Sequence, residues 1–151
     1  MIHISRRSAL PEDMSLSDIR LPARETLKRS GIQGDLTVVL TDNRTIQNLN
    51  REFRKIDSIT DVLSFQSDEI DPQTNIRYLG DIIISVEKAN EQAKQNGRSF
   101  FNEMTMLIVH GCLHLAGFDH ASNEEKESMR RIQEDVLLSL GVANYAWPED
   151  S

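Results

Sequence analysis

The feature that most restricts the fold of this chain is an apolar segment, residues 102–116, that carries two histidines. Its length and composition predict a buried helix, the most apolar one in the chain. His110 and His114 are four residues apart, so they would share one face of that helix, roughly 6 Å apart along its axis. Gly117 is placed to end the helix, because glycine readily adopts the left-handed conformation that closes helices. The segment therefore predicts a central helix that presents two imidazoles to one ligand.

A third histidine, His120, follows the predicted end of this helix. If the chain turns back at the glycine, three imidazoles can bind one ion and leave a fourth position open, as in catalytic zinc sites. We therefore predict one Zn²⁺ ion bound by His110, His114 and His120, while three imidazoles would also accept nickel, copper or cobalt. Closed structural zinc sites usually include cysteine. The only cysteine, Cys112, falls on the opposite side of the helix from His110, where we expect it to be a core residue.

The spacing H-x-x-x-H-x-x-G-x-x-H is that of the metzincin proteases, in which a glutamate follows the first histidine and acts as general base. In this chain that position is Gly111. Without the carboxylate, peptide hydrolysis lacks an obvious base, which weakens the peptidase interpretation. Phosphodiester cleavage gains more from cations and hydrogen-bond donors around its charged transition state than from a single carboxylate. It therefore stays compatible with the motif.

The rest of the chain mixes short β-rich runs with amphipathic helical segments. Strands are predicted at residues 2–5, 36–40, 62–65 and 81–85. Further helices are predicted at residues 16–30, 43–53, 86–96 and 122–140, an exposed loop at 67–77 and a loose tail at 144–151. Pro22 moves the expected regular start of the first helix to about Leu21. The expected class is α+β, with a small mixed four-stranded sheet packed with about five helices in one zincin-like domain, residues 1–151.

Composition limits the partners that such a chain can have. Its 151 residues include 17 Lys and Arg against 24 Asp and Glu, a formal charge of −7. This balance argues against a protein that coats nucleic acid through a globally basic surface, and against stable binding to an anionic membrane. No signal peptide or membrane-spanning run is visible, and a lone cysteine allows no intrachain disulfide. We expect a cytoplasmic protein with no membrane or DNA partner.

One short segment departs from this acidic average. From Asn43 to Lys55 four cations stand against one carboxylate, that of Glu52. A guanidinium such as that of Arg54 can hold a phosphate through two parallel hydrogen bonds and stabilise charge growing on its oxygens. For the other arginines of the segment, a solvated helix face is an equally good explanation. A narrow positive cleft on an acidic protein is therefore compatible with an RNA substrate.

The histidine segment, HGCLHLAGFDH, resembles the signature of the YbeY family of bacterial rRNA maturation factors, which are single-strand-specific metallo-endoribonucleases. Three further segments match that family in order: LNREFRKIDSITDVLSF at 49–65, LGDIIIS at 79–85, and the closing helix up to Leu140-Gly141. The resemblance implies that the three histidines of the motif hold a zinc ion and that Arg54 is the catalytic arginine of the cleft. It also implies single-stranded rRNA as substrate, the ribosome or ribosomal proteins as partners, and a role in 16S rRNA 3′-end maturation and ribosome quality control.

Two other functions stay open at this point. A metallopeptidase of the metzincin type would take its base from elsewhere in the chain. A non-catalytic ribosome-assembly factor would hold structural zinc and cleave nothing. Three aspartates receive no catalytic assignment: turn chemistry explains Asp61, a nearby backbone hydrogen bond explains Asp81, and Asp119 is a candidate acceptor for the imidazole of His120.

Overall fold

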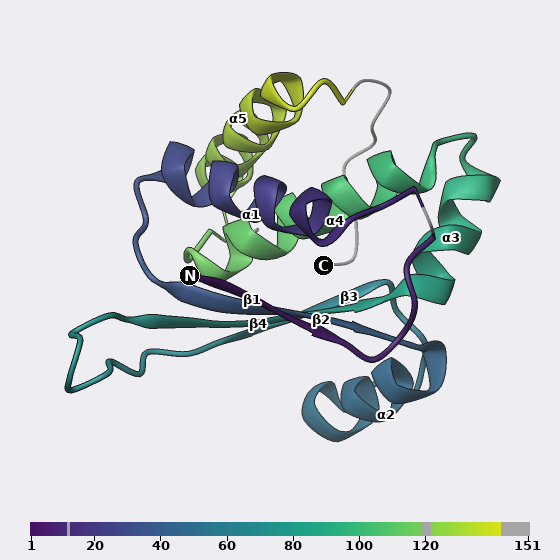
Figure 1. Cartoon of the computed structure of the whole chain (residues 1–151), viewed down its shortest axis with the longest axis horizontal. Helices are drawn as coiled ribbons and strands as arrows, with labels where there is room; N and C mark the ends of the chain where they lie inside the picture. Colours follow the sequence, from purple (N-terminus) through teal and green to yellow (C-terminus); the bar gives the residue numbers. More distant parts are fainter. Residues whose placement is uncertain (12, 119–121, 143–151) are drawn as a thin grey trace.

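A mixed β-sheet of four described strands forms the centre of the molecule (Figure 1). The structure is a computed structural model that describes residues 1–11, 13–118 and 122–142. The strands are β1 (Ile2–Arg6), β2 (Asp35–Thr41), β3 (Val62–Gln66) and β4 (Tyr78–Ser85), in the spatial order β1-β2-β4-β3. β1, β2 and β4 are parallel, and β3 runs antiparallel to β4 at the second edge. The predicted α+β class with a small mixed sheet is confirmed.

The described part of the chain contains five helices: α1 (Leu16–Ser30), α2 (Asn43–Arg54), α3 (Val86–Gln95), α4 (Phe100–Leu115) and α5 (Asn123–Ser139). Each begins after a Ser or Asp whose side-chain oxygen accepts a backbone N–H of the first turn. α4 begins at Phe100, directly after its Ser99 cap and two residues earlier than predicted. None of the described helices is both long and apolar enough to span a bilayer. The predicted tail at 144–151 lies outside the described residues.

The predicted start of the first helix near Leu21 is wrong. α1 begins at Leu16 and continues through Pro22, which is buried. Ser15 and Asp18 form a capping box, in which each side chain accepts the backbone N–H of the other residue. This cap satisfies the donors that a helix start leaves without partners, so the helix begins before the proline. The proline then removes only one backbone donor from an established helix.

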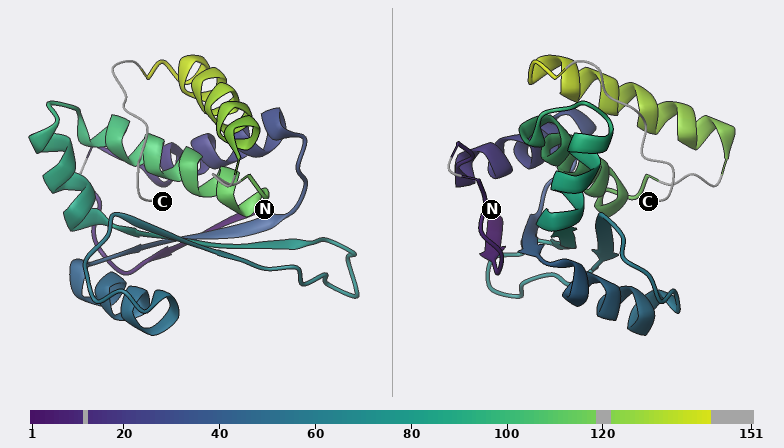
Figure 2. Two further views of the ribbon diagram at one scale, coloured as in Figure 1. Left: turned by 180° about the vertical axis from the view of Figure 1, so that it is seen from behind. Right: turned by 90° about the vertical axis from the view of Figure 1, so that its right-hand side faces the viewer.

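Helices cover both faces of the sheet (Figures 1 and 2). α1 and α4 lie on one face, α5 packs on the outer side of α4, and α2 lies on the opposite face. The main core lies between the sheet, α1 and α4, a second cluster lies between α4 and α5, and a small third one under α2. Because both faces of β4 are covered, its apolar residues form a nearly continuous run instead of alternating with polar ones.

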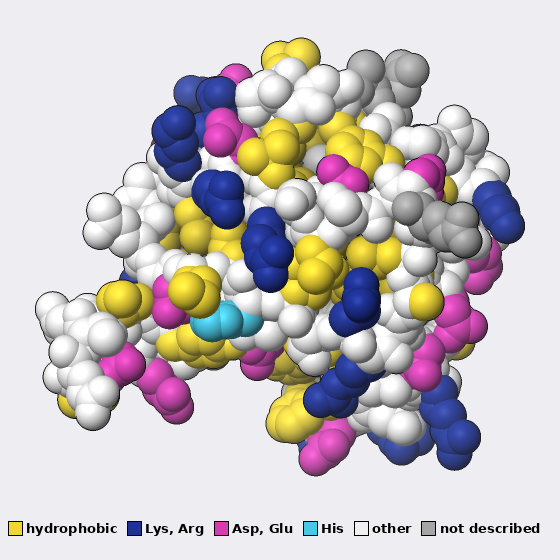
Figure 3. Space-filling view, viewed as in Figure 1, with side chains coloured by type: hydrophobic (Ala, Val, Ile, Leu, Met, Phe, Trp, Pro, Cys, Tyr) yellow, Lys and Arg dark blue, Asp and Glu magenta, His cyan; other side chains and the backbone are white. Residues whose placement is uncertain are grey.

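Basic side chains gather on parts of the surface despite the net negative charge. Figure 3 shows the face that α1 and β1 occupy in Figure 1, where Lys and Arg side chains form a diagonal series. On α1, Arg20, Arg24 and Lys28 recur every four residues, so they share one side of the helix. This face lies at the β1 edge of the sheet, whereas β3 forms the other edge. The net charge of the chain therefore does not describe the charge of each face.

A buried polar network fixes the point where the chain enters β3. Arg98 and Glu103 form an ion pair of 2.7 Å, with side chains that are 12% and 5% exposed. Gln92 of α3 donates from Nε2 to Glu103 at 3.2 Å and to Asp61 at 3.0 Å. Asp61 also accepts the backbone N–H of Val62, the first residue of β3, at 2.8 Å. The network thus connects α3 and α4 to the edge strand of the sheet.

Replacing Glu103 with alanine should lower the free energy of unfolding by about 3–5 kcal/mol, because the substitution leaves the largely buried Arg98 cation without its carboxylate. The matched control is Glu127→Ala, which breaks an exposed ion pair with Arg131 on α5 and should change stability by less than about 1 kcal/mol. Urea unfolding followed by circular dichroism measures both values. Equal losses for the two variants would contradict a special role for the buried pair.

Candidate metal centre and cleft

Two histidines of α4 bring their imidazoles to one point. α4 has more buried residues than any other described helix, so packing restricts the directions of its side chains. His110 is fully buried and His114 half-buried. Their Nε2 atoms are 3.1 Å apart, and the two rings meet at 83°. Two nitrogens bound to one tetrahedral zinc ion lie about 3.3 Å apart, so the pair fits two ligands of a single ion.

His120, the third ligand expected from the sequence, lies outside the described residues, as does Asp119. Among the residues that the structure describes, no three His, Cys, Asp or Glu side chains come together. The chain leaves α4 as the sequence predicts, with Gly117 in the left-handed region at a φ of +97°. The N–H of Gly117 donates to the carbonyl of His114 at 3.1 Å. His120 therefore remains a ligand proposed from the sequence motif.

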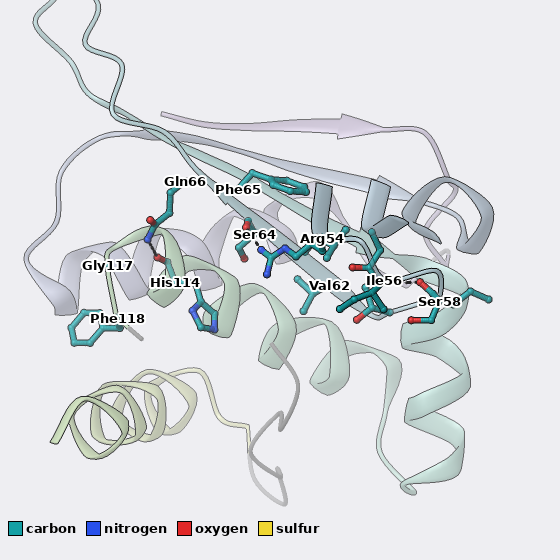
Figure 4. A pocket seen from close by; sticks show the side chains of 14 residues that line it. Arg54, Ile56, Ser58, Val62, Ser64, Phe65, Gln66, His114, Gly117 and Phe118 are labelled. Atoms are coloured by element: carbon teal, nitrogen blue, oxygen red, sulfur yellow. Dashed lines mark hydrogen bonds between the residues drawn. The ribbon is translucent and has the colours of Figure 1, made fainter. Parts of the chain in front are cut away.

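An open cleft of about 1070 Å³ lies between the end of α2, β3 and the end of α4 (Figure 4). Arg54 reaches into it from α2, Gln66 from β3 and His114 from α4. Gln66 donates from Nε2 to the carbonyl of His114 at 2.6 Å, which connects the edge strand to the helix end. Among the described lining residues Arg54 is the one Lys or Arg, and none is Asp or Glu. The cleft thus combines a guanidinium with one imidazole of the histidine pair.

Arg54 is held at the edge of the sheet by two contacts. Its Nη2 donates to the carbonyl of Ser64 in β3 at 2.8 Å. Its guanidinium carbon lies 5.7 Å from the centroid of the Phe65 ring, within the range of a cation–π contact. By contrast, Arg51 pairs with Asp57 at 3.7 Å and does not line the cleft. The basic segment 43–55 therefore contributes one of its four cations to the cleft.

Asp61, Asp81 and Cys112 have structural roles. Asp61 belongs to the buried network described above, and Asp81 accepts the hydroxyl of Tyr78. Burial, followed by the hydrogen bond to Asp81, raises the pKa of Tyr78. Cys112 lies in the main core, and burial raises the pKa of its thiol well above its ordinary value. It is therefore a protonated core residue, which agrees with the expectation from its place on the helix.

Comparison with known proteins decides the family. The family model described as Endoribonuclease YbeY matches residues 12–141. The chain belongs to the YbeY family. A relative from Carboxydothermus hydrogenoformans, named Endoribonuclease YbeY, is 49% identical over 118 residues, which cover 78% of this chain and 80% of the relative. Another of the same name, from Brevibacillus brevis, is 40% identical over 154 aligned residues, covering 93% and 97%.

A solved structure supports the same fold. The solution structure of a Thermotoga maritima protein is similar to this chain with a TM-score of 0.61 and 28% sequence identity. The match covers 93% of this chain and 92% of that one. The helices and strands described above therefore have the arrangement of an experimentally determined fold over nearly the whole length of both chains.

This YbeY-family chain has Gly111 where metzincin proteases have a glutamate, and the packing of α4 on β4 explains the difference. A Cβ atom at position 111 would lie 2.8 Å from Cγ2 of Ile82 in β4. The position therefore faces the sheet, where α4 and β4 approach closely, and does not line the cleft. A glutamate there would have to displace the buried Ile82 side chain. The structure thus leaves no room for the base that metzincins carry at this point of the motif.

Gly111→Ala should lower the free energy of unfolding by about 1–2 kcal/mol, since the overpacking penalty exceeds the gain in helix propensity. Ile82→Ala should destabilise the Gly111→Ala chain less than it destabilises the parent chain, because it removes the atoms that clash. Urea unfolding of the two single variants and the double variant measures this coupling. A Gly111→Ala variant more stable than the parent chain would mean that α4 and β4 have space between them.

Proposed function

We propose that this chain is a metal-dependent endoribonuclease that cleaves single-stranded RNA, with one zinc ion held by His110, His114 and His120. The observation that carries the proposal is the convergence of two imidazole nitrogens 3.1 Å apart beside a cleft that contains Arg54. Membership of the YbeY family supports RNA as the substrate. By the same resemblance, we propose that it acts in the cytoplasm on 16S rRNA 3′ ends and in ribosome quality control, with ribosomal partners.

The histidines and Arg54 have different proposed roles in catalysis. Zinc, when bound by the histidines, supplies Lewis-acid activation of water. Arg54 then contacts the phosphate and stabilises the negative charge that grows on its oxygens in the transition state. One of its five N–H donors is engaged with the carbonyl of Ser64, which orients the planar guanidinium before the substrate arrives. The absence of carboxylates among the described lining residues keeps a negative phosphate from being repelled.

An exposed aromatic ring beside Arg54 favours a single strand over a duplex. Phe53 is 60% exposed, and its ring meets that of Phe65 edge-on at 5.5 Å. Phe53 is not one of the described lining residues of the cleft, but Phe65, which it contacts, lines it. The exposed side chains of Ile56 and Ile59 line it as well. Unpaired bases stack on such surfaces, whereas paired bases are stacked inside their own helix. We therefore propose that the base next to the bound phosphate packs on Phe53.

The two alternative functions gain less support. A metallopeptidase needs a base, and Gly111 faces Ile82 while the described lining residues include no carboxylate. A non-catalytic assembly factor with structural zinc has no need of an open cleft with a positioned arginine. Metal content and RNA cleavage measured on the same preparation separate this last case from the enzyme.

Cleavage of a short single-stranded RNA tests the proposal directly. The parent chain loaded with zinc should cleave it, and a chelator should abolish the activity. His114→Ala should lose activity entirely, and Arg54→Glu should lose about 100-fold or more, because it removes a donor to the transition state and adds a negative charge. Arg54→Lys keeps the charge and should retain intermediate activity. Equal cleavage by all preparations would indicate a contaminating nuclease and overturn the assignment.

The role of Phe53 is tested separately, as RNA binding without turnover. Phe53→Ala should weaken the binding of a short oligouridine by about 10-fold, since base–aromatic stacking contributes about 1–3 kcal/mol, while Phe53→Tyr should bind like the parent chain. Fluorescence anisotropy with metal-depleted protein at fixed salt measures the dissociation constants. The matched control is Ile70→Ala, which removes an exposed apolar side chain from the segment between β3 and β4, away from Phe65 and Arg54. Unchanged affinity in Phe53→Ala would contradict the stacking role.

A further inference from the structure

A glutamine is buried on the apolar face of α5. Gln133 is 0% exposed, and its neighbours on the same helix face, Met129, Val136 and Leu137, are all buried apolar residues. Burying an amide among apolar side chains is unfavourable unless its polar atoms are hydrogen-bonded. A methionine or leucine would fill the same space without this penalty. The position of Gln133 therefore calls for a role other than packing.

The one hydrogen bond described for its side chain goes to a histidine of the proposed metal centre. His110 Nδ1 lies 3.3 Å from Gln133 Oε1, and both residues are fully buried. The amide nitrogen of Gln133 has no hydrogen-bond partner among the described residues. The amide oxygen thus bonds to the histidine, whereas the two N–H donors of the amide have no described acceptor.

This contact decides which nitrogen of His110 can bind an ion. A neutral imidazole carries one proton and one lone pair, and an amide oxygen accepts only from a protonated nitrogen. When Nδ1–H donates to Oε1, the lone pair is on Nε2, which lies 3.1 Å from His114 Nε2. If the amide nitrogen faced the ring instead, Nε2 would carry the proton and could not bind a metal.

We propose that Gln133 is a positioning residue that holds His110 in the tautomer and orientation needed to bind the metal. The inference rests on the proposed metal centre and assigns to α5 a part in it. α5 otherwise contacts α4 through apolar side chains, chiefly Met129, Val136 and Leu137 against Met106, Val109 and Leu113. The packing of α5 on α4 therefore places Gln133 against His110, and through this contact it affects the metal affinity of the site.

The test is zinc affinity of the full chain, measured by competition with a fluorescent chelator after metal removal. Gln133→Met, which keeps the volume and removes the acceptor, should bind zinc about 10–100-fold more weakly than the parent chain. Gln133→Glu supplies a stronger acceptor and should bind at least as tightly as the parent chain. Val136→Ala, a buried change on the same helix face, should leave the zinc affinity unchanged. A thermal melt of each metal-free variant establishes that the chain is folded before zinc is added.

The possible results separate this inference from the proposed function. If Gln133→Met and the parent chain bind zinc equally while His114→Ala does not, the metal centre stands and the role of Gln133 is overturned. If Gln133→Met and Val136→Ala weaken zinc binding alike, the effect is one of packing and the role is again overturned. If the parent chain shows no zinc site that depends on His114, both the metal centre and the role of Gln133 fail.

Discussion

Helix α4 packs against β3 and β4 on one side and against α5 on the other, which leaves its side chains little freedom to rotate. Its close approach to β4 depends on Gly111, where no side chain fits beside Ile82. The same packing sets the direction of His110 and His114, whose Nε2 atoms lie 3.1 Å apart. Close packing of this kind fixes side-chain orientation as part of the folded core, so little conformational entropy is left for the imidazoles to lose when a ligand binds.

The second part of the site comes from the opposite face of the sheet. α2 lies on that face, yet its last residue, Arg54, contacts the edge strand β3 and reaches the cleft on the α4 side. β3 can hold Arg54 near the histidines because contacts with other elements fix both ends of the strand. The buried network around Glu103 holds its start, and Gln66 ties its end to the carbonyl of His114. A shift of this short strand would move the arginine relative to the histidines.

Much of the fold follows from local signals in the sequence. The helix predicted at 43–53 forms α2, the apolar run around His110 forms the buried α4, and Gly117 follows its end. The wrong prediction at Pro22 shows the limit of rules based on one residue, because the capping box of Ser15 and Asp18, seven and four residues upstream, outweighs the loss of one backbone donor. The spatial order of the strands was not predicted, since parallel pairing joins residues far apart in the sequence.

The site was predicted less completely than the fold. The spacing of the histidines predicts the proposed metal ligands, but family resemblance, not local pattern, singled out Arg54 among its neighbours. The prediction from the sequence did not single out Phe53 or Gln133, for which we propose roles in RNA binding and in positioning His110. A signal for Gln133 exists, because it falls four residues after Met129 and three before Val136, on the apolar face of an amphipathic helix. Recognising it as a partner of His110 requires the packing of α5 on α4, which no local pattern gives.

If the proposed site is correct, histidines of α4 and no sulfur atom bind the catalytic ion. X-ray absorption at the zinc edge of the zinc-loaded protein tests it most directly. The account predicts nitrogen and oxygen neighbours at about 2.0–2.1 Å, including several imidazoles, and a lower imidazole count in His114→Ala. A sulfur neighbour at about 2.3 Å, or a spectrum that His114→Ala leaves unchanged, would contradict it.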